Sequence, residues 1–127
     1  MIKNGEYCTF KNLEYELTMD MDGKLLIISK DPLLLKEGFI DKYESGVYSK
    51  VVKSSELSNC HRVSFKGKIK GEIANVYRED KYNYYVGTSD AEVARKLGLE
   101  RTDKYYYEKW VPKNEVGIFE ERKEIKL

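Results

Sequence analysis

Histidine, cysteine, proline and tryptophan are all scarce in this sequence of 127 residues, which holds one His, two Cys, two Pro and one Trp. With His61 alone, the chain has one side chain that titrates near neutral pH, so general acid–base catalysis has little to use. Cys60 precedes His61, and adjacent strand residues point to opposite faces, so the two do not form a nucleophile–base pair. A zinc site would need further ligands, and Cys8 alone remains. The sequence indicates no catalytic, metal or cofactor site, and we expect that the protein is not an enzyme.

Long hydrophobic runs are also missing. The longest, Leu25–Ile28, is typical of a strand and falls far short of the ~18 apolar residues that suggest a membrane-spanning helix. The first ten residues lack the apolar core of a signal peptide. We therefore expect no membrane contact and a cytoplasmic location, in which Cys8 and Cys60 are reduced thiols. A disulfide between these two cysteines stays open, because their spacing argues neither way.

Neither sign of charge is in excess. The 23 Lys and Arg residues against 22 Asp and Glu leave a formal net charge of +1. This balance argues against disorder driven by net charge and against nucleic-acid binding driven by bulk charge. With 41% hydrophobic residues and 11 tyrosines to fill a core, a chain of this length is expected to form one domain over residues 1–127.

An internal repeat organises the sequence. Residues 48–57 and 107–116 match at an offset of 59, with Tyr, Lys, Val and Glu in register. Each half is interpreted as strand, strand, helix, strand, in units of about residues 5–59 and 60–116, followed by a tail over 117–127 whose type is open. The sequence therefore predicts an α+β fold in which two tandem ββαβ-like repeats form a pseudo-twofold, mainly antiparallel β domain with short helices.

Local signals place the elements of each half. Asp31-Pro32 starts a short helix that Gly38 ends, and Ser89 caps a second helix that Gly98 ends. We expect strands over residues 7–17, 24–29, 47–52, 62–77, 82–88 and 105–111, of which 62–77 is long enough to be bent or bulged.

Tyrosines are the first candidates for binding a partner. Tyr82 and Tyr84 lie in one expected strand, and Tyr105 and Tyr106 lie in another. Side chains alternate between the faces of a strand, so members of each group can lie on the outer face as anchors for a protein. The alternative is that tyrosine simply favours strands and lies half buried there.

Acidic residues concentrate on the first expected hairpin. Glu14 and Glu16 share a strand face, and Asp20 and Asp22 lie in the turn that follows. Such a patch suits a basic partner and speeds association with it, although an ordinary solvated face would look the same.

Lysines alternate with other residues at Lys66, Lys68 and Lys70, which would place three ammonium groups on one strand face. Together with the tyrosines, this face suggests a small nucleic-acid-binding module as the alternative function. A strand edge protected by lysine is the other interpretation. The sequence carries no RNP-like or KH-like motif, so we expect no nucleic-acid partner.

Two segments resemble a known family. Residues 87–99, GTSDAEVARKLGL, and residues 106–113, YYEKWVPK, resemble small cytoplasmic immunity proteins encoded beside bacterial polymorphic toxins. The resemblance implies that the chain binds a cognate toxin protein, encoded next to it, and neutralises it. These motifs are structural, so no contact residue follows from them. The sequence leaves the oligomeric state open.

Overall fold

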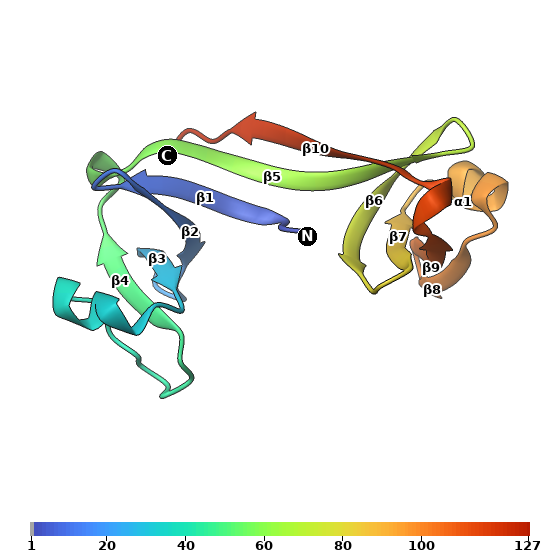
Figure 1. Cartoon of the computed structure of the whole chain (residues 1–127). Helices are drawn as coiled ribbons and strands as arrows, with labels where there is room; N and C mark the ends of the chain where they lie inside the picture. Colours follow the sequence, from blue (N-terminus) through green and yellow to red (C-terminus); the bar gives the residue numbers. More distant parts are fainter. Residues whose placement is uncertain (1) are drawn as a thin grey trace. The chain divides into compact units, whose positions relative to one another are not determined.

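The computed structural model describes residues 2–127 and is built mainly of antiparallel strands (Figure 1). Strands account for 55% of the residues and helices for 15%, and one helix reaches seven residues. The α+β fold of ββαβ repeats is therefore wrong, and the fold is β-rich. Two physical reasons explain the error: the segments interpreted as single long strands are hairpins, and the first expected helix is a short 3₁₀ helix.

The elements have the following bounds, with η marking a 3₁₀ helix: β1 (Gly5–Phe10), β2 (Leu13–Met19), β3 (Leu25–Ser29), η1 (Pro32–Glu37), β4 (Tyr48–Val52), η2 (Ser54–Glu56), β5 (Ser58–Ile69), β6 (Glu72–Glu79), β7 (Asn83–Thr88), α1 (Ala91–Leu97), β8 (Glu100–Asp103), β9 (Tyr106–Pro112), η3 (Lys113–Glu115) and β10 (Gly117–Glu124). The tail left open by the sequence is thus largely a strand. No helix of the described residues is long and apolar enough to cross a membrane.

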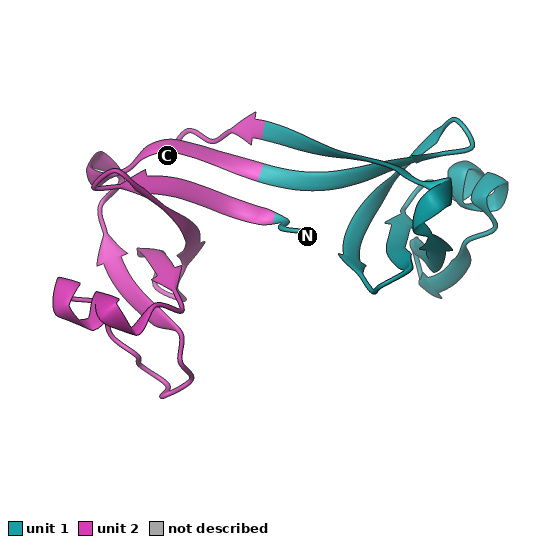
Figure 2. Cartoon of the chain, in the orientation of Figure 1, with its two compact units in different colours: residues 1–4, 63–122 teal, residues 5–62, 123–127 magenta. Residues whose placement is uncertain are grey.

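The chain divides into two compact units, coloured separately in Figure 2. The N-terminal unit comprises residues 5–62 and 123–127, with strand order β4-β3-β2-β1 followed by the first part of β5. The C-terminal unit comprises residues 2–4 and 63–122, with the second part of β5 followed by β6-β7-β9-β8. Strand β10 pairs with β5. That the whole chain forms one folding domain stays a prediction.

The spacing of elements recurs between the two units. β2 and β6 start 59 residues apart, and so do η1 and α1, and η2 and η3. The offset of 59 seen in the sequence therefore relates positions of the N-terminal unit to positions of the C-terminal unit. Each unit begins with one additional strand, β1 or β5, which forms a hairpin with the next strand. The repeated series of elements is therefore longer than ββαβ.

Two tight turns create those additional strands. Lys11 and Asn12 both have positive φ, 48° and 67°, and so do Lys70 and Gly71, 49° and 80°. Two consecutive residues of positive φ form the type I′ turn that joins hairpin strands. The single strands expected over residues 7–17 and 62–77 are therefore wrong. Lys70 lies in a turn, so the expected run of three lysines along one strand is not formed.

The structure largely confirms the residues predicted to begin and end the two helices. Asp31 accepts a hydrogen bond from the backbone N–H of Leu33 at 3.0 Å, and Gly38 ends the helix with φ 87°. In α1 the capping residue is Asp90 and not Ser89: the Asp90 carboxylate accepts from the backbone N–H groups of Glu92 and Val93. A short helix of this kind depends on the core that it covers.

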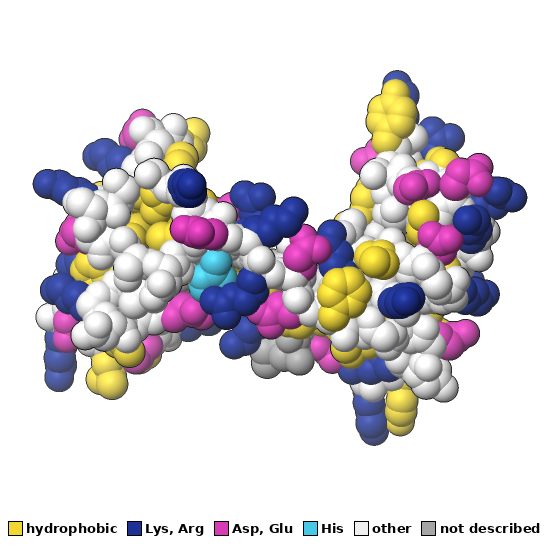
Figure 3. All heavy atoms as spheres, turned by 90° about the horizontal axis from the view of Figure 1, so that it is seen from above, with side chains coloured by type: hydrophobic (Ala, Val, Ile, Leu, Met, Phe, Trp, Pro, Cys, Tyr) yellow, Lys and Arg dark blue, Asp and Glu magenta, His cyan; other side chains and the backbone are white. Residues whose placement is uncertain are grey.

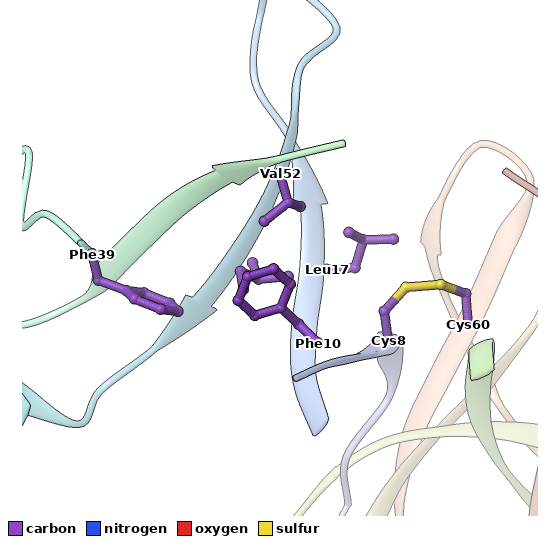
Figure 4. Packing of buried hydrophobic residues seen from close by; sticks show 7 residues of the cluster. Cys8, Phe10, Leu17, Phe39, Val52 and Cys60 are labelled. Carbon is purple, nitrogen blue, oxygen red and sulfur yellow. A yellow bond between two sulfur atoms is a disulfide. The ribbon is translucent and has the colours of Figure 1, made fainter. Parts of the chain in front are cut away.

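Each unit has its own hydrophobic core. The core of the N-terminal unit, shown in Figure 4, consists of Cys8, Phe10, Leu17, Ile27, Phe39, Val52 and Cys60. Cys8 and Cys60 form a disulfide in this core, so the expectation of reduced thiols is wrong. The core of the C-terminal unit consists of Ile69, Ala74, Val76, Val86, Leu97 and Val111, with α1 in contact with β6, β7 and β9.

Candidate functional site

Five side chains gather on the outer face of the C-terminal sheet, which points away from the core of that unit. Val76, Val86 and Val111 are buried on the core side, so their strand neighbours point outward. A register shift between Val76 and Arg78 adds one residue to β6 there, and such bulges redirect side chains. We call the resulting surface the aromatic face, and its members are Tyr77, Arg78, Tyr85, Tyr106 and Trp110.

A row of three side chains forms the centre of the aromatic face. Arg78 lies directly opposite Tyr85, and Tyr85 lies directly opposite Trp110. The Arg78 guanidinium carbon is 4.5 Å from the centroid of the Tyr85 ring and 5.4 Å from that of Trp110. The two rings are themselves 5.0 Å apart. Cation–π attraction and the tilted contact between the two rings hold this row in place while Trp110 stays 40% exposed.

A polar row runs beside the aromatic one. The Lys66 ammonium donates to Asn75 Oδ1 at 2.6 Å, and Asn75 Nδ2 donates to the Tyr106 hydroxyl at 3.0 Å. The Tyr106 hydroxyl also bonds to that of Tyr77. Burial raises the pKa of the Tyr106 phenol above its ordinary value, and the Asn75 hydrogen bond works against this rise. Gly87 lies opposite Asn75 on β7 and has no side chain, so the Tyr106 ring can lie across that strand.

Substitution of Gly87 by alanine is expected to disturb the aromatic face. The new Cβ would lie 2.6 Å from Cε2 of Tyr106, which is closer than real Cβ atoms come to another side chain, and a tight 3.0 Å from Cε2 of Tyr77. Overpacking of this kind destabilises by about 1–3 kcal/mol, which urea unfolding measures. Gly117 is the matched control, since a Cβ there would meet Lys68 at an ordinary 3.7 Å. Equal urea midpoints for G87A and G117A would contradict the expected clash.

The tyrosines proposed from the sequence do not form one patch. Tyr106 belongs to the aromatic face, whereas Tyr84 packs on the core side with the Lys113 ammonium 5.1 Å from its ring centroid. Tyr82 and Tyr105 are 68% and 72% exposed and lie in turns. Along the β7–β9 pair Tyr84 is opposite Val111 near one end, while Tyr106 lies at the other end.

Sequence reasoning missed Tyr77 and Arg78, whereas Tyr85 and Trp110 lie in the two expected tyrosine-rich strands but were not among the chosen candidates. Tyr85 is adjacent to the apolar Val86, and Trp110 is adjacent to Val111. Because adjacent strand residues point to opposite faces, the sequence could have indicated that Tyr85 and Trp110 point outward. The bulge that brings Arg78 beside Tyr85 has no comparable signal, because it depends on the pairing of β6 with β7.

The acidic candidates lie in the N-terminal unit. Glu14 and Glu16 are exposed on the outer side of β2, as expected, and Glu14 Oε2 is 3.8 Å from His61 Nε2. Asp20 Oδ1 accepts from the backbone N–H of Asp22 at 2.9 Å and of Lys24 at 2.8 Å, so the Asp20 carboxylate also closes the turn. Asp22 is exposed in the same turn.

The single histidine is a packed residue of the N-terminal unit. His61 is buried, its Nδ1 is 2.8 Å from the carbonyl oxygen of Asn59, and its ring stacks on Tyr7. Among residues 2–127 no group of three or more His, Cys, Asp or Glu side chains is arranged to hold a metal ion. Acidic and basic side chains are interspersed over the surface in Figure 3, so that view presents no broad field of one sign.

Comparison with known proteins adds a family but no activity. The family model described as Uncharacterised conserved protein UCP033725 matches residues 2–127. No curated protein and no solved structure matches the chain.

Proposed function

The chain belongs to the family of uncharacterised conserved proteins UCP033725, and we propose that it is an immunity protein that binds and neutralises a cognate bacterial toxin domain. The aromatic face carries this proposal. Trp, Tyr and Arg are the residue types that dominate binding energy at protein interfaces, and here they lie together, half exposed and held in place by one another. The resemblance of residues 87–99 and 106–113 to immunity proteins supplies the class of the partner.

Recognition of single-stranded nucleic acid by the same face is the second candidate. Aromatic side chains on a sheet stack with bases, and Lys66 and Lys68 lie on the strand beside them. Three observations favour a protein partner instead. Lys66 is already bonded to Asn75, Lys70 lies in a turn, and the carboxylate of Glu108 shares the face, directly opposite Gly87.

Trp110 provides a direct test, because it is the only tryptophan of the chain. Titration with the purified product of the neighbouring gene is expected to shift the Trp110 fluorescence to shorter wavelength and to reduce its quenching by acrylamide. The two proteins should also elute together from a size-exclusion column. Separate elution at micromolar concentration with unchanged emission would reject the proposal. A shift produced by a single-stranded oligonucleotide at low salt, and not by the neighbouring protein, would favour the second candidate.

A cytoplasmic location is part of the proposal, and the disulfide argues against it, since disulfides persist mainly in oxidising compartments. Trapping of free thiols by alkylation at the moment of cell lysis decides the matter. Two alkylated cysteines would support a reducing compartment, and none would place the mature protein in an oxidising one.

A further inference from the structure

The guanidinium of Arg78 differs from those of three other arginines in having no polar partner. Arg62 and Arg95 each pair with a carboxylate, and Arg101 donates to two backbone carbonyl oxygens. Within residues 2–127, Arg78 contacts two aromatic rings and forms no hydrogen bond or ion pair. A guanidinium has five N–H donors, so those of Arg78 are left for water or for a bound group.

The two rings hold the Arg78 guanidinium without using its N–H groups. Its central carbon is 4.5 Å from the Tyr85 ring centroid and 5.4 Å from that of Trp110, and the side chain is exposed. Arginine contacts aromatic rings through its planar face, while its donors lie in that plane as a fork that matches a carboxylate. A side chain already held in this way loses less entropy when it binds a partner.

No carboxylate next to Arg78 in the chain is left to pair with it. Glu79 pairs with the Lys113 ammonium at 2.7 Å, and Asp80 accepts two backbone N–H groups in the turn that follows β6. On the aromatic face itself, the row of Arg78, Tyr85 and Trp110 contains no acidic residue. The surroundings of this guanidinium therefore suit a carboxylate that comes from another molecule.

The charged residues of the outer face are divided between its two sides. Lys66 and Lys68 point outward from β5, beside Arg78 on β6, because they lie opposite outward residues of β6. Glu108 and Glu100 lie directly opposite each other on β9 and β8. Two strand spacings of ~4.8 Å separate β6 from β9. A carboxylate over β6 thus lies near basic groups, whereas the negative backbone of a nucleic acid would also meet the acidic side.

We infer that Arg78 determines which partner the aromatic face accepts, by binding the carboxylate of an aspartate or glutamate side chain in that partner. The carboxylate accepts two N–H groups of the guanidinium, and apolar groups beside it cover Trp110 and Tyr85. The charged, bidentate pair provides selectivity, and the rings provide the apolar contact. This inference rests on the proposed function only in taking the partner to be a toxin, and free peptides test it separately.

The probes are three acetylated and amidated five-residue peptides, in which a central glutamate, glutamine or lysine has two prolines on each side. Proline keeps such a peptide extended and packs on aromatic surfaces. Trp110 is the only tryptophan present, so its emission reports binding. The glutamate peptide is expected to change the emission, and the glutamine and lysine peptides should bind at least about threefold more weakly. Unchanged emission at millimolar glutamate peptide, or equal binding of the glutamate and glutamine peptides, would overturn the inference.

Substitutions of Arg78 separate the donor fork from net charge. R78Q should bind the glutamate peptide no more tightly than the glutamine peptide, and R78K should recover only part of the difference, because lysine lacks the planar fork. R95Q is the matched control: it removes the same charge from α1, which covers the core side of the sheet, and should bind as the wild type does. Equal losses in R78Q and R95Q would mean that net charge decides, which would reject the role of Arg78.

Failure of this inference is distinguishable from failure of the proposed function. If the neighbouring gene product binds the wild-type chain and R78Q equally well, the role of Arg78 is wrong and the proposed function stands. If the glutamate peptide binds through Arg78 and the gene product does not bind, the proposed function is wrong and the carboxylate site stands. A single-stranded oligonucleotide that binds through Arg78 more tightly than the glutamate peptide would overturn the inference in favour of a phosphate ligand.

Discussion

Reduction of the disulfide between Cys8 and Cys60 is expected to lower the free energy of unfolding by about 4 kcal/mol. The two cysteines are separated by 52 residues in sequence, and closing a loop of that length removes much conformational entropy from the unfolded chain. Both side chains lie in the core of the N-terminal unit, and Cys8 is fully buried. A loss of this size is a large fraction of the stability of a small protein.

Urea unfolding of the wild-type protein with and without a phosphine reductant measures this effect. The reduced protein should unfold at a midpoint lower by more than about 1 M urea. The control is the double variant C8A/C60A, on which the reductant should have no effect. The chain has only these two cysteines, so a thiol assay under denaturing conditions should find none before reduction and two after it. Equal midpoints in a sample shown to have changed from disulfide to thiols would contradict the expected stabilisation.

Replacement of Trp110 by alanine is expected to weaken partner binding by about 2–4 kcal/mol, or roughly 30- to 700-fold in Kd. The reason is that Trp110 is the largest side chain of the aromatic face, and its neighbours Tyr85 and Arg78 already hold it in position. Little conformational entropy is then lost when a partner covers it. Isothermal titration calorimetry with the neighbouring gene product gives the change in Kd.

The exposed tyrosines provide matched controls for Trp110. Tyr82 and Tyr105 belong to the same unit and are more exposed, but both lie outside the aromatic face. Y82A and Y105A should therefore change Kd less than about threefold. R78K should weaken binding although it keeps the charge, because lysine lacks the planar group that stacks on the rings. If W110A binds as the wild type does while Y82A or Y105A abolishes binding, the anchors are the tyrosines inferred from the sequence and not the aromatic face.

Local chemistry made several elements predictable. The start of the first helix follows from Asp31-Pro32 and its end from Gly38, and the structure confirms both. The apolar run at residues 24–29 was correctly predicted as a strand, and so were the strands at 47–52 and 105–111. These features depend on adjacent residues, whose backbone preferences and capping bonds act over one turn or one strand.

The errors concern pairing. The turns at Lys11-Asn12 and Lys70-Gly71 lack the sequence pairs most typical of type I′ turns, Asn-Gly or Asp-Gly, so two hairpins were interpreted as single long strands. The strand content was underestimated because β8 and β10 were not predicted as strands. Strand β8 is short and exposed at every residue, so it shows no alternation to recognise. The disulfide joins residues brought together by the pairing of β1 with β5, which spacing in the sequence does not reveal.

The amino-acid sequence alone determines the scarcity of histidine and cysteine, the balance of charge, the offset of 59 and the ends of the helices. Each is a property of composition or of residues close together in the chain. The aromatic face is different in kind. Arg78, Tyr85 and Trp110 meet because β6, β7 and β9 pair in one register with one bulge, and a shift by one residue would turn these side chains to the other face. Tertiary pairing therefore decides which of the many tyrosines and basic residues lie together on a surface.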